Sequence, residues 1–109
     1  MSVSPNPANG SQLLAPHREE LDRINLRLVD LLAERMQVCR RIARVKAANG
    51  LPMMQPQRIG STLAQVRSLS HSRQLRPEYL DGLFRLVIEE TCAEELLVMA
   101  SQAPPTREG

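Results

Sequence analysis

Apolar residues recur at every third or fourth position from Arg18 to about Ala48, and no proline or glycine interrupts them. The apolar positions are Leu21, Ile24, Leu28, Leu31, Leu32, Val38, Ile42 and Val45. This spacing predicts one long amphipathic α-helix, roughly 45 Å in length at 1.5 Å per residue. Because such a helix is longer than the diameter of a domain of this size, we expect its far end to pack against a second chain.

Two shorter helices are predicted after the long one. The pair Asn49–Gly50 tolerates the left-handed conformation that ends a helix, and residues 51–55 should form a loop. Pro56 suits the first turn of a second helix, which we expect to end near Ser72, and Pro77 suits the start of a third. The apolar face of the second helix comprises Ile59, Leu63, Val66 and Leu69, and that of the third comprises Leu80, Leu83, Phe84, Val87, Ile88, Leu96 and Leu97.

The third helix should end near Met99, and no alternating strand pattern, internal repeat or glycine-rich phosphate loop is found. The predicted fold class is therefore all-α, with one long and two shorter helices. Residues 1–16 do not resemble a secretory signal, and no apolar run is long enough to span a membrane. We expect a disordered leader at 1–16, a helical domain at 17–100, a disordered tail at 101–109 and a cytoplasmic location.

Composition narrows the possible partners. The net charge is only +2 and aromatic residues make up 2% of the chain, which argues against a nucleic-acid binder. Cys39 and Cys92 lie far apart without a neighbouring cysteine or histidine cluster, so we expect two small core residues and neither a disulfide nor a metal site. His17 and His71 are interpreted as surface residues.

Two cations interrupt the apolar face of the long helix. Arg35 and Lys46 are eleven residues apart, which places them within about 20° of one another and about 16 Å apart along the axis. Burying either cation without an anion would cost several kcal/mol. They could instead extend to solvent at the edge of the face.

The third helix carries a hydroxyl and a carboxyl on its inward face. Thr91 and Glu95 lie four residues apart, between Ile88 and Val98. Together with the two cations they could form a polar site for a small anionic ligand. The structural alternative is an internal salt bridge from Glu95 to Lys46 or Arg35.

Two further arginines are ambiguous on their own. Arg18 precedes Arg35 by 17 residues, about 26 Å along the helix and about 100° around it, so one small ligand cannot contact both within a single chain. Arg18 could reach the site of a partner chain, or it could be a solvated residue of the first turn. Arg58, in the first turn of the second helix, is equally open to either interpretation.

Three segments together resemble the AroQ chorismate mutase family over residues 18 to about 99. They are REELDRINLRLVDLLAERMQVCRRIARVK, NGLPMMQPQR and LRPEYLDGLFRLVIEET, in this order and with matching intervening lengths. The resemblance implies an intertwined all-helical homodimer with two shared sites, and a cofactor-free, metal-free rearrangement of a small dicarboxylate substrate. This fold would explain both the overlong helix and the isolated Arg18.

The resemblance also implies roles for individual residues. Arg18 of the partner chain and Arg35 would hold the two substrate carboxylates, Lys46 would donate to the ether oxygen, and Arg58 would support the ring end. Thr91 stands where many members have serine, so the hydroxyl is kept. A [3,3] shift needs no nucleophile or base, so holding the reactive conformer and stabilising charge as the C–O bond breaks are the tasks left to these residues.

Three positions depart from the common bacterial pattern. Gln55 and Ile59 replace an acidic pair beside the loop arginine, and Glu95 replaces a glutamine that donates to the ether oxygen. An ionised Glu95 would repel the developing negative charge, and the sequence leaves its protonation state open. The segments PMMQPQR and EETCAEELLVM look more like the 4-amino-4-deoxychorismate mutases of antibiotic pathways, so this substrate is favoured over chorismate itself.

Other functions stay open at this point. The chain could be an ordinary chorismate mutase that makes prephenate for phenylalanine and tyrosine synthesis. It could also be an isochorismate-pyruvate lyase, which uses the same cations, or a helical dimer without catalytic activity. Retention of all four cations argues against the last, because a scaffold would gain stability from apolar replacements.

Overall fold

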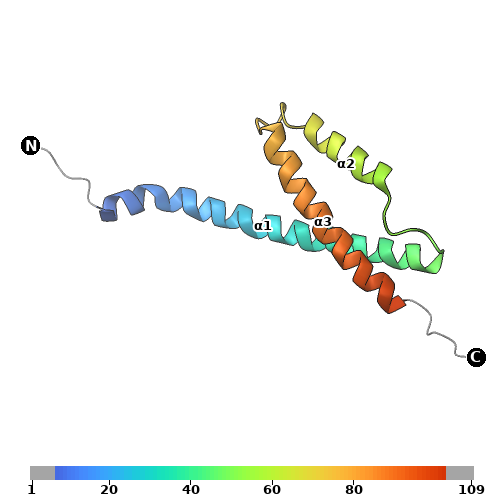
Figure 1. Ribbon diagram of the computed structural model, residues 1–109. Helices are drawn as coiled ribbons and strands as arrows, with labels where there is room; N and C mark the ends of the chain where they lie inside the picture. Colours follow the sequence, from blue (N-terminus) through green and yellow to red (C-terminus); the bar gives the residue numbers. More distant parts are fainter. Residues whose placement is uncertain (1–6, 103–109) are drawn as a thin grey trace, which may run out of the picture. The chain divides into compact units, whose positions relative to one another are not determined.

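A computed structural model of the chain describes residues 7–102. It contains three helices, α1 (Pro7–Ala48), α2 (Pro56–Ser68) and α3 (Pro77–Gln102), and no strand occurs in this range (Figure 1). The prediction of an all-α chain with one long and two shorter helices is confirmed. Over the same range, every helix is too short or too polar to cross a membrane.

The end of α1 follows from its local sequence. Gly50 has a φ of +63°, in the left-handed region that glycine adopts without a steric cost. The N–H of Leu51 donates to the carbonyl of Lys46 at 2.8 Å, which is the long-range bond of a Schellman cap. The Asn49 side chain donates to the carbonyl of Val45 at 2.8 Å. The last carbonyls of the helix are thus satisfied where the Asn49–Gly50 pair predicted the helix end.

The start of α1 differs from the prediction. The helix begins at Pro7, so residues 7–16 of the expected disordered leader are helical, and residues 1–6 lie outside the described range. A proline at the first helical position loses no hydrogen bond, and Gln12, Leu13, Leu14 and Ala15 are strong helix formers. These local preferences outweigh the hydrogen bond that Pro16 cannot donate within the helix.

The ends of the other two helices also shift. α2 stops at Ser68, four residues before the expected end, because the chain tightens there: the N–H groups of Leu69 and Ser70 donate three residues back, each at 3.1 Å. Gln74 has a φ of +56° and completes the turn that leads to α3. α3 continues to Gln102, so the first two residues of the expected tail are helical, and residues 103–109 lie outside the described range.

The chain divides into two compact units, with the boundary inside α1 between Arg35 and Met36. The described part of the first unit is helix alone, and every side chain from 11 to 34 is exposed. Leu21 and Leu31, on the predicted apolar face, are 56% and 59% exposed. This unit therefore presents an apolar face that its own residues do not cover.

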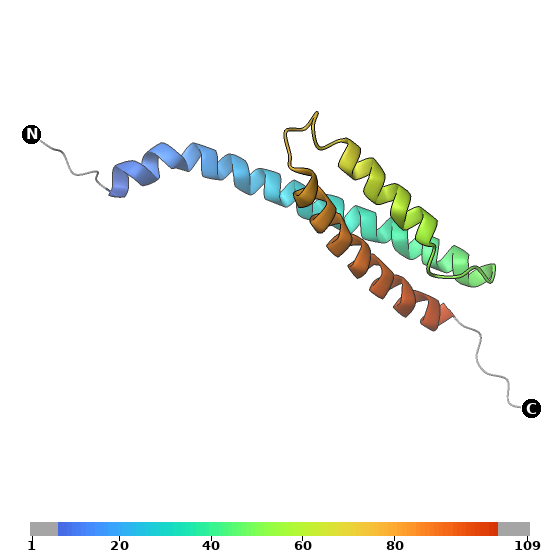
Figure 2. The same ribbon diagram turned by 45° about the horizontal axis from the view of Figure 1, so that its top comes forward.

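The second unit contains a small core. Here α2 packs against α3, to which it is joined by a short turn (Figure 2). The buried apolar residues are Cys39 and Ala43 of α1, Leu63 of α2 and Leu80 of α3. Cys92 is half-buried, and neither cysteine forms a disulfide. Because few apolar side chains are buried, the buried polar groups of this unit are important for the arrangement of its helices.

Candidate functional site

Lys46 and Glu95 form a buried ion pair in the second unit. Lys46 lies in the last turn of α1 and Glu95 on the inward face of α3, and Nζ is 2.7 Å from Oε1. Their side chains are 13% and 8% exposed, so this pair is more buried than the pairs Arg40–Glu94 and Arg85–Asp81. The structural alternative considered for Glu95, a salt bridge to Lys46, is therefore present.

A backbone carbonyl is the second partner of the Lys46 ammonium. Nζ donates to the carbonyl oxygen of Met53, in the loop after α1, at 2.8 Å. An ammonium has three N–H donors, and these two bonds use two of them. The third donor can serve a bound molecule without loss of either protein contact.

Lys46 is also chemically distinct within this chain. Of the fourteen basic residues, Lys46 is the single lysine and all others are arginine. A lysine ammonium is a compact charge with rotatable donors, whereas an arginine presents a rigid planar fork. This composition signal marks Lys46 in the sequence itself. The carbonyl of Met53, in contrast, has no signature in the sequence, because every residue carries one.

Thr91 lies one helical turn before Glu95 and is likewise buried. Its hydroxyl donates to the carbonyl of Val87 at 2.8 Å, as is common for threonine within a helix. This bond uses the hydroxyl hydrogen and orients the oxygen as an acceptor. The inward face of α3 therefore carries a carboxylate and a hydroxyl four residues apart, as the sequence predicted.

The start of α2 carries the three candidates Gln55, Arg58 and Ile59. Gln55 is the N-cap residue, and its carbonyl accepts from the N–H groups of Arg58 and Ile59 at 3.0 and 3.2 Å. Its side chain does not cap the helix; the amide nitrogen lies 3.4 Å from the carbonyl of Pro52. Arg58 is exposed and Ile59 is half-buried. The roles expected for these residues toward a substrate stay predictions.

The two remaining candidates, Arg18 and Arg35, belong to the first unit. Arg18 is exposed and Arg35 is half-buried. Within the second unit the structure therefore joins Lys46 and Glu95 directly. The assignment of these two arginines to the same site rests on the family resemblance and stays a prediction.

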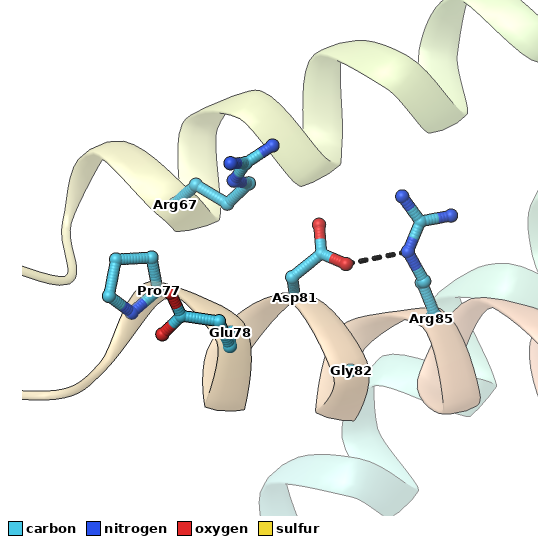
Figure 3. A pocket seen from close by; sticks show the side chains of 6 residues that line it. All are labelled: Arg67, Pro77, Glu78, Asp81, Gly82 and Arg85. Atoms are coloured by element: carbon cyan, nitrogen blue, oxygen red, sulfur yellow. Dashed lines mark hydrogen bonds and ion pairs between the residues drawn. The ribbon is translucent and has the colours of Figure 1, made fainter.

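A separate cavity of about 250 Å³ lies between the end of α2 and the start of α3 (Figure 3). Its lining residues are Arg67, Pro77, Glu78, Asp81, Gly82 and Arg85. Arg85 donates to Oδ2 of Asp81 at 2.6 Å, whereas Oδ1 is buried without a hydrogen-bond partner. Two arginines and two acidic residues line this cavity, and none of the candidate site residues contributes, so the proposed function is not assigned to it.

Comparison with known proteins identifies relatives of the chain. The family model described as chorismate mutase type II matches residues 17–96, a range that contains all eight candidate site residues. The 4-amino-4-deoxychorismate mutase of Streptomyces pristinaespiralis is 32% identical over 99 residues, which cover 91% of this chain and 77% of the relative. The protein of the same name from Streptomyces venezuelae is 34% identical over 86 residues, 79% of this chain and 84% of the relative. The isochorismate pyruvate lyase of Pseudomonas aeruginosa is 30% identical over 83 residues, 76% and 81% of the two chains.

The buried ion pair predicts a marked dependence of stability on Glu95. We expect Glu95→Leu to lower the free energy of unfolding by about 2–3 kcal/mol, because it leaves a largely buried ammonium without its anion. The double variant Lys46→Met/Glu95→Leu should regain most of this loss. Arg85→Gln, which breaks a pair whose arginine is 64% exposed, should cost about 0.5 kcal/mol or less. Urea unfolding followed by circular dichroism measures all three, and equal costs for Glu95→Leu and Arg85→Gln would contradict this interpretation.

Proposed function

Because the chain belongs to the chorismate mutase type II family and is an isomerase of that type, we propose that it converts 4-amino-4-deoxychorismate to 4-amino-4-deoxyprephenate. The observation that supports mutase chemistry is the Lys46 ammonium, which is held by two protein acceptors with one N–H donor left. The choice of substrate is supported by the two Streptomyces relatives, each of which bears the name 4-amino-4-deoxychorismate mutase. We place the reaction in cytoplasmic secondary metabolism that leads to an antibiotic.

In this proposal the reaction is a unimolecular [3,3] shift of the enolpyruvyl group. The protein holds the flexible substrate in its reactive chair and stabilises the charge that develops as the C–O bond breaks. Arg35 and Arg18 of a second copy grip the two carboxylates, since planar guanidinium groups bind carboxylates in two places. Lys46 donates its third N–H to the ether oxygen, where negative charge develops. No cofactor or metal ion takes part.

Glu95 then acts on the substrate through Lys46. An ionised carboxylate close to the ether oxygen would oppose the developing negative charge. With Oε1 2.7 Å from Nζ, however, the ammonium neutralises that carboxylate and can lie between it and the substrate. We therefore assign Glu95 the task of orienting Lys46, in place of the direct donation that a glutamine would give.

Near the ring, Gln55, Arg58, Ile59 and Thr91 are proposed to contact the substrate. Gln55 and Ile59 are neutral, so neither supplies a carboxylate to bind a ring hydroxyl or an ammonium group. Arg58 is exposed and supports the ring end of the substrate. These side chains therefore do not select between an amino and a hydroxyl group at ring C4. Chorismate is the alternative substrate, and an assay with both compounds distinguishes them.

The proposed active unit is a homodimer. The first unit exposes an apolar face that includes Leu21, Leu28, Leu31 and Leu32, and an isolated helix of this kind is only marginally stable in water. A second copy of the chain would cover this face and bring its Arg18 to the site. The overlong first helix supports the same arrangement.

A second candidate function is the elimination of pyruvate from isochorismate. It is favoured by the similarity to the Pseudomonas aeruginosa relative, which bears the name of that lyase. The same cations would bind this substrate, so product analysis is needed to separate the two activities. A dimer without catalytic activity remains the third alternative.

The substrate is tested by assaying the purified protein with chorismate, 4-amino-4-deoxychorismate and isochorismate in parallel. We expect the amino compound to be converted fastest, with 4-amino-4-deoxyprephenate as the product identified by mass spectrometry. Faster conversion of chorismate to prephenate would make the chain an ordinary chorismate mutase. Release of salicylate and pyruvate from isochorismate alone would support the lyase, and turnover of none of the three would contradict a catalytic function.

The site assignment is tested by single substitutions. Arg35→Ala and Lys46→Ala should each lower kcat/KM at least about 100-fold while helicity is retained, because each removes a contact to a developing or fixed charge. His17→Ala and His71→Ala, at exposed positions, should stay within about twofold, since the rearrangement needs no general base. An Arg35→Ala or Lys46→Ala variant with full activity would remove that residue from the site.

The dimer is tested by sedimentation equilibrium at micromolar concentration. We expect twice the 12.2 kDa mass of one chain. Mixing Arg18→Ala and Arg35→Ala chains should partly restore activity, because a mixed dimer with shared sites has one site with both arginines intact. A folded and active monomer would contradict the shared site.

A further inference from the structure

The loop of residues 49–55, here named the Lys46 loop, forms hydrogen bonds with both the backbone and the side chain of Lys46. The Lys46 carbonyl accepts from the N–H groups of Asn49 at 3.3 Å and Leu51 at 2.8 Å. The Lys46 ammonium donates to the carbonyl of Met53 at 2.8 Å. The residue is therefore held through its backbone and its side chain by the same short segment.

Local features fix the conformation of the Lys46 loop. Gly50 reverses the chain through its left-handed conformation, φ +63°. Pro52 and Pro56 each restrict φ. At the far end the Gln55 carbonyl accepts from the N–H groups of Arg58 and Ile59 in the first turn of α2, and its side-chain amide lies 3.4 Å from the Pro52 carbonyl. The carbonyl of Met53 thus has a defined position between the capped end of α1 and the first turn of α2.

We infer that the Lys46 loop is a positioning element for catalysis, in which Gly50 sets the place of the Met53 carbonyl and this carbonyl, together with Glu95, aims the Lys46 ammonium at the substrate. This inference rests on the proposed function. The Lys46 ammonium lies at the end of a flexible side chain with four methylene groups. It can stabilise the transition state efficiently only if its position is fixed before the substrate binds. Gly50 and Met53 act through Lys46 and do not themselves contact the substrate.

Gly50 offers a clean substitution for this test. A Cβ at this position meets no atom within 4 Å, so alanine would add no clash there and its effect comes from the backbone conformation. Alanine disfavours a positive φ, whereas asparagine tolerates it. Gly82 in α3 is a matched control, because a Cβ there also meets no atom within 4 Å and the helical conformation suits alanine.

The first readout is steady-state kinetics of Gly50→Ala, Gly50→Asn and Gly82→Ala with the substrate that the wild-type protein turns over fastest. We expect Gly50→Ala to lower kcat about tenfold with KM changed less than about twofold, since an aimed ammonium matters most in the transition state. Gly50→Asn should keep at least half of the wild-type kcat, and Gly82→Ala should match the wild type. Equal kcat for Gly50→Ala and wild type, or equal losses in the alanine and asparagine variants, would overturn the inference.

The second readout needs no activity. Because Lys46 is the single lysine, protein labelled with ¹⁵N at lysine Nζ gives one ammonium signal in an NMR spectrum. We expect this signal to be protected from exchange with water in the wild type, Gly50→Asn and Gly82→Ala, and to be broadened or lost in Gly50→Ala. A wild-type ammonium that exchanges as fast as free lysine would overturn the inference even if the mutase activity is confirmed. A protected signal in a protein without mutase activity would support the loop's hold on Lys46 while the proposed function fails, so the two failures are distinguishable.

Discussion

The enclosure of one ammonium group is the constraint on which the rest of the second unit depends. A largely buried lysine is tolerated only where an anion and further acceptors replace its water. Glu95 provides the anion from α3, and Met53 provides a carbonyl from the loop after α1. Meeting this requirement draws together the end of α1, the loop and the middle of α3. The same contacts leave one N–H donor of the ammonium for a ligand. The arrangement that compensates the buried charge therefore also allows the group to bind a substrate.

The weakness of the apolar core gives this polar cluster its importance. Cys39, Ala43, Leu63 and Leu80 are small to medium in size, and they are the buried apolar residues among those described. Most of the remaining leucines are exposed, above all along the first unit. A second copy that covers these leucines would supply the missing apolar burial and the partner's arginine in one step. In the proposed dimer, association of two chains would therefore also complete the site.

Local signals allowed most of the fold to be predicted. Pro56, Pro77 and the Asn49–Gly50 pair mark helix ends because their backbone preferences act within a few residues. The ends that were predicted less well, at Pro7 and Ser68, depend on small differences in propensity and on turn bonds that carry no strong residue signature.

The site was predictable only in part, for a physical reason. Inward polar residues at helical spacing indicated Lys46 and Glu95, and their salt bridge was one of the pairings considered. That Lys46 pairs with Glu95 could be seen only once the structure placed the end of α1 beside α3. The contacts to the backbone carbonyls of Met53 and Pro52 could not be predicted, because backbone acceptors have no sequence signature. Family resemblance then supplied roles that geometry alone does not assign.

The central claim, that Lys46 is the donor to the breaking C–O bond, is tested most directly by a crystal structure of the chain with a bicyclic dicarboxylate ether that mimics the transition state. The account predicts that the ether oxygen lies within hydrogen-bond distance of Lys46 Nζ, which keeps its bonds to Glu95 and Met53, and that Arg18 of a second copy contacts a carboxylate. An inhibitor bound away from Lys46, for example in the cavity beside Asp81, would contradict it.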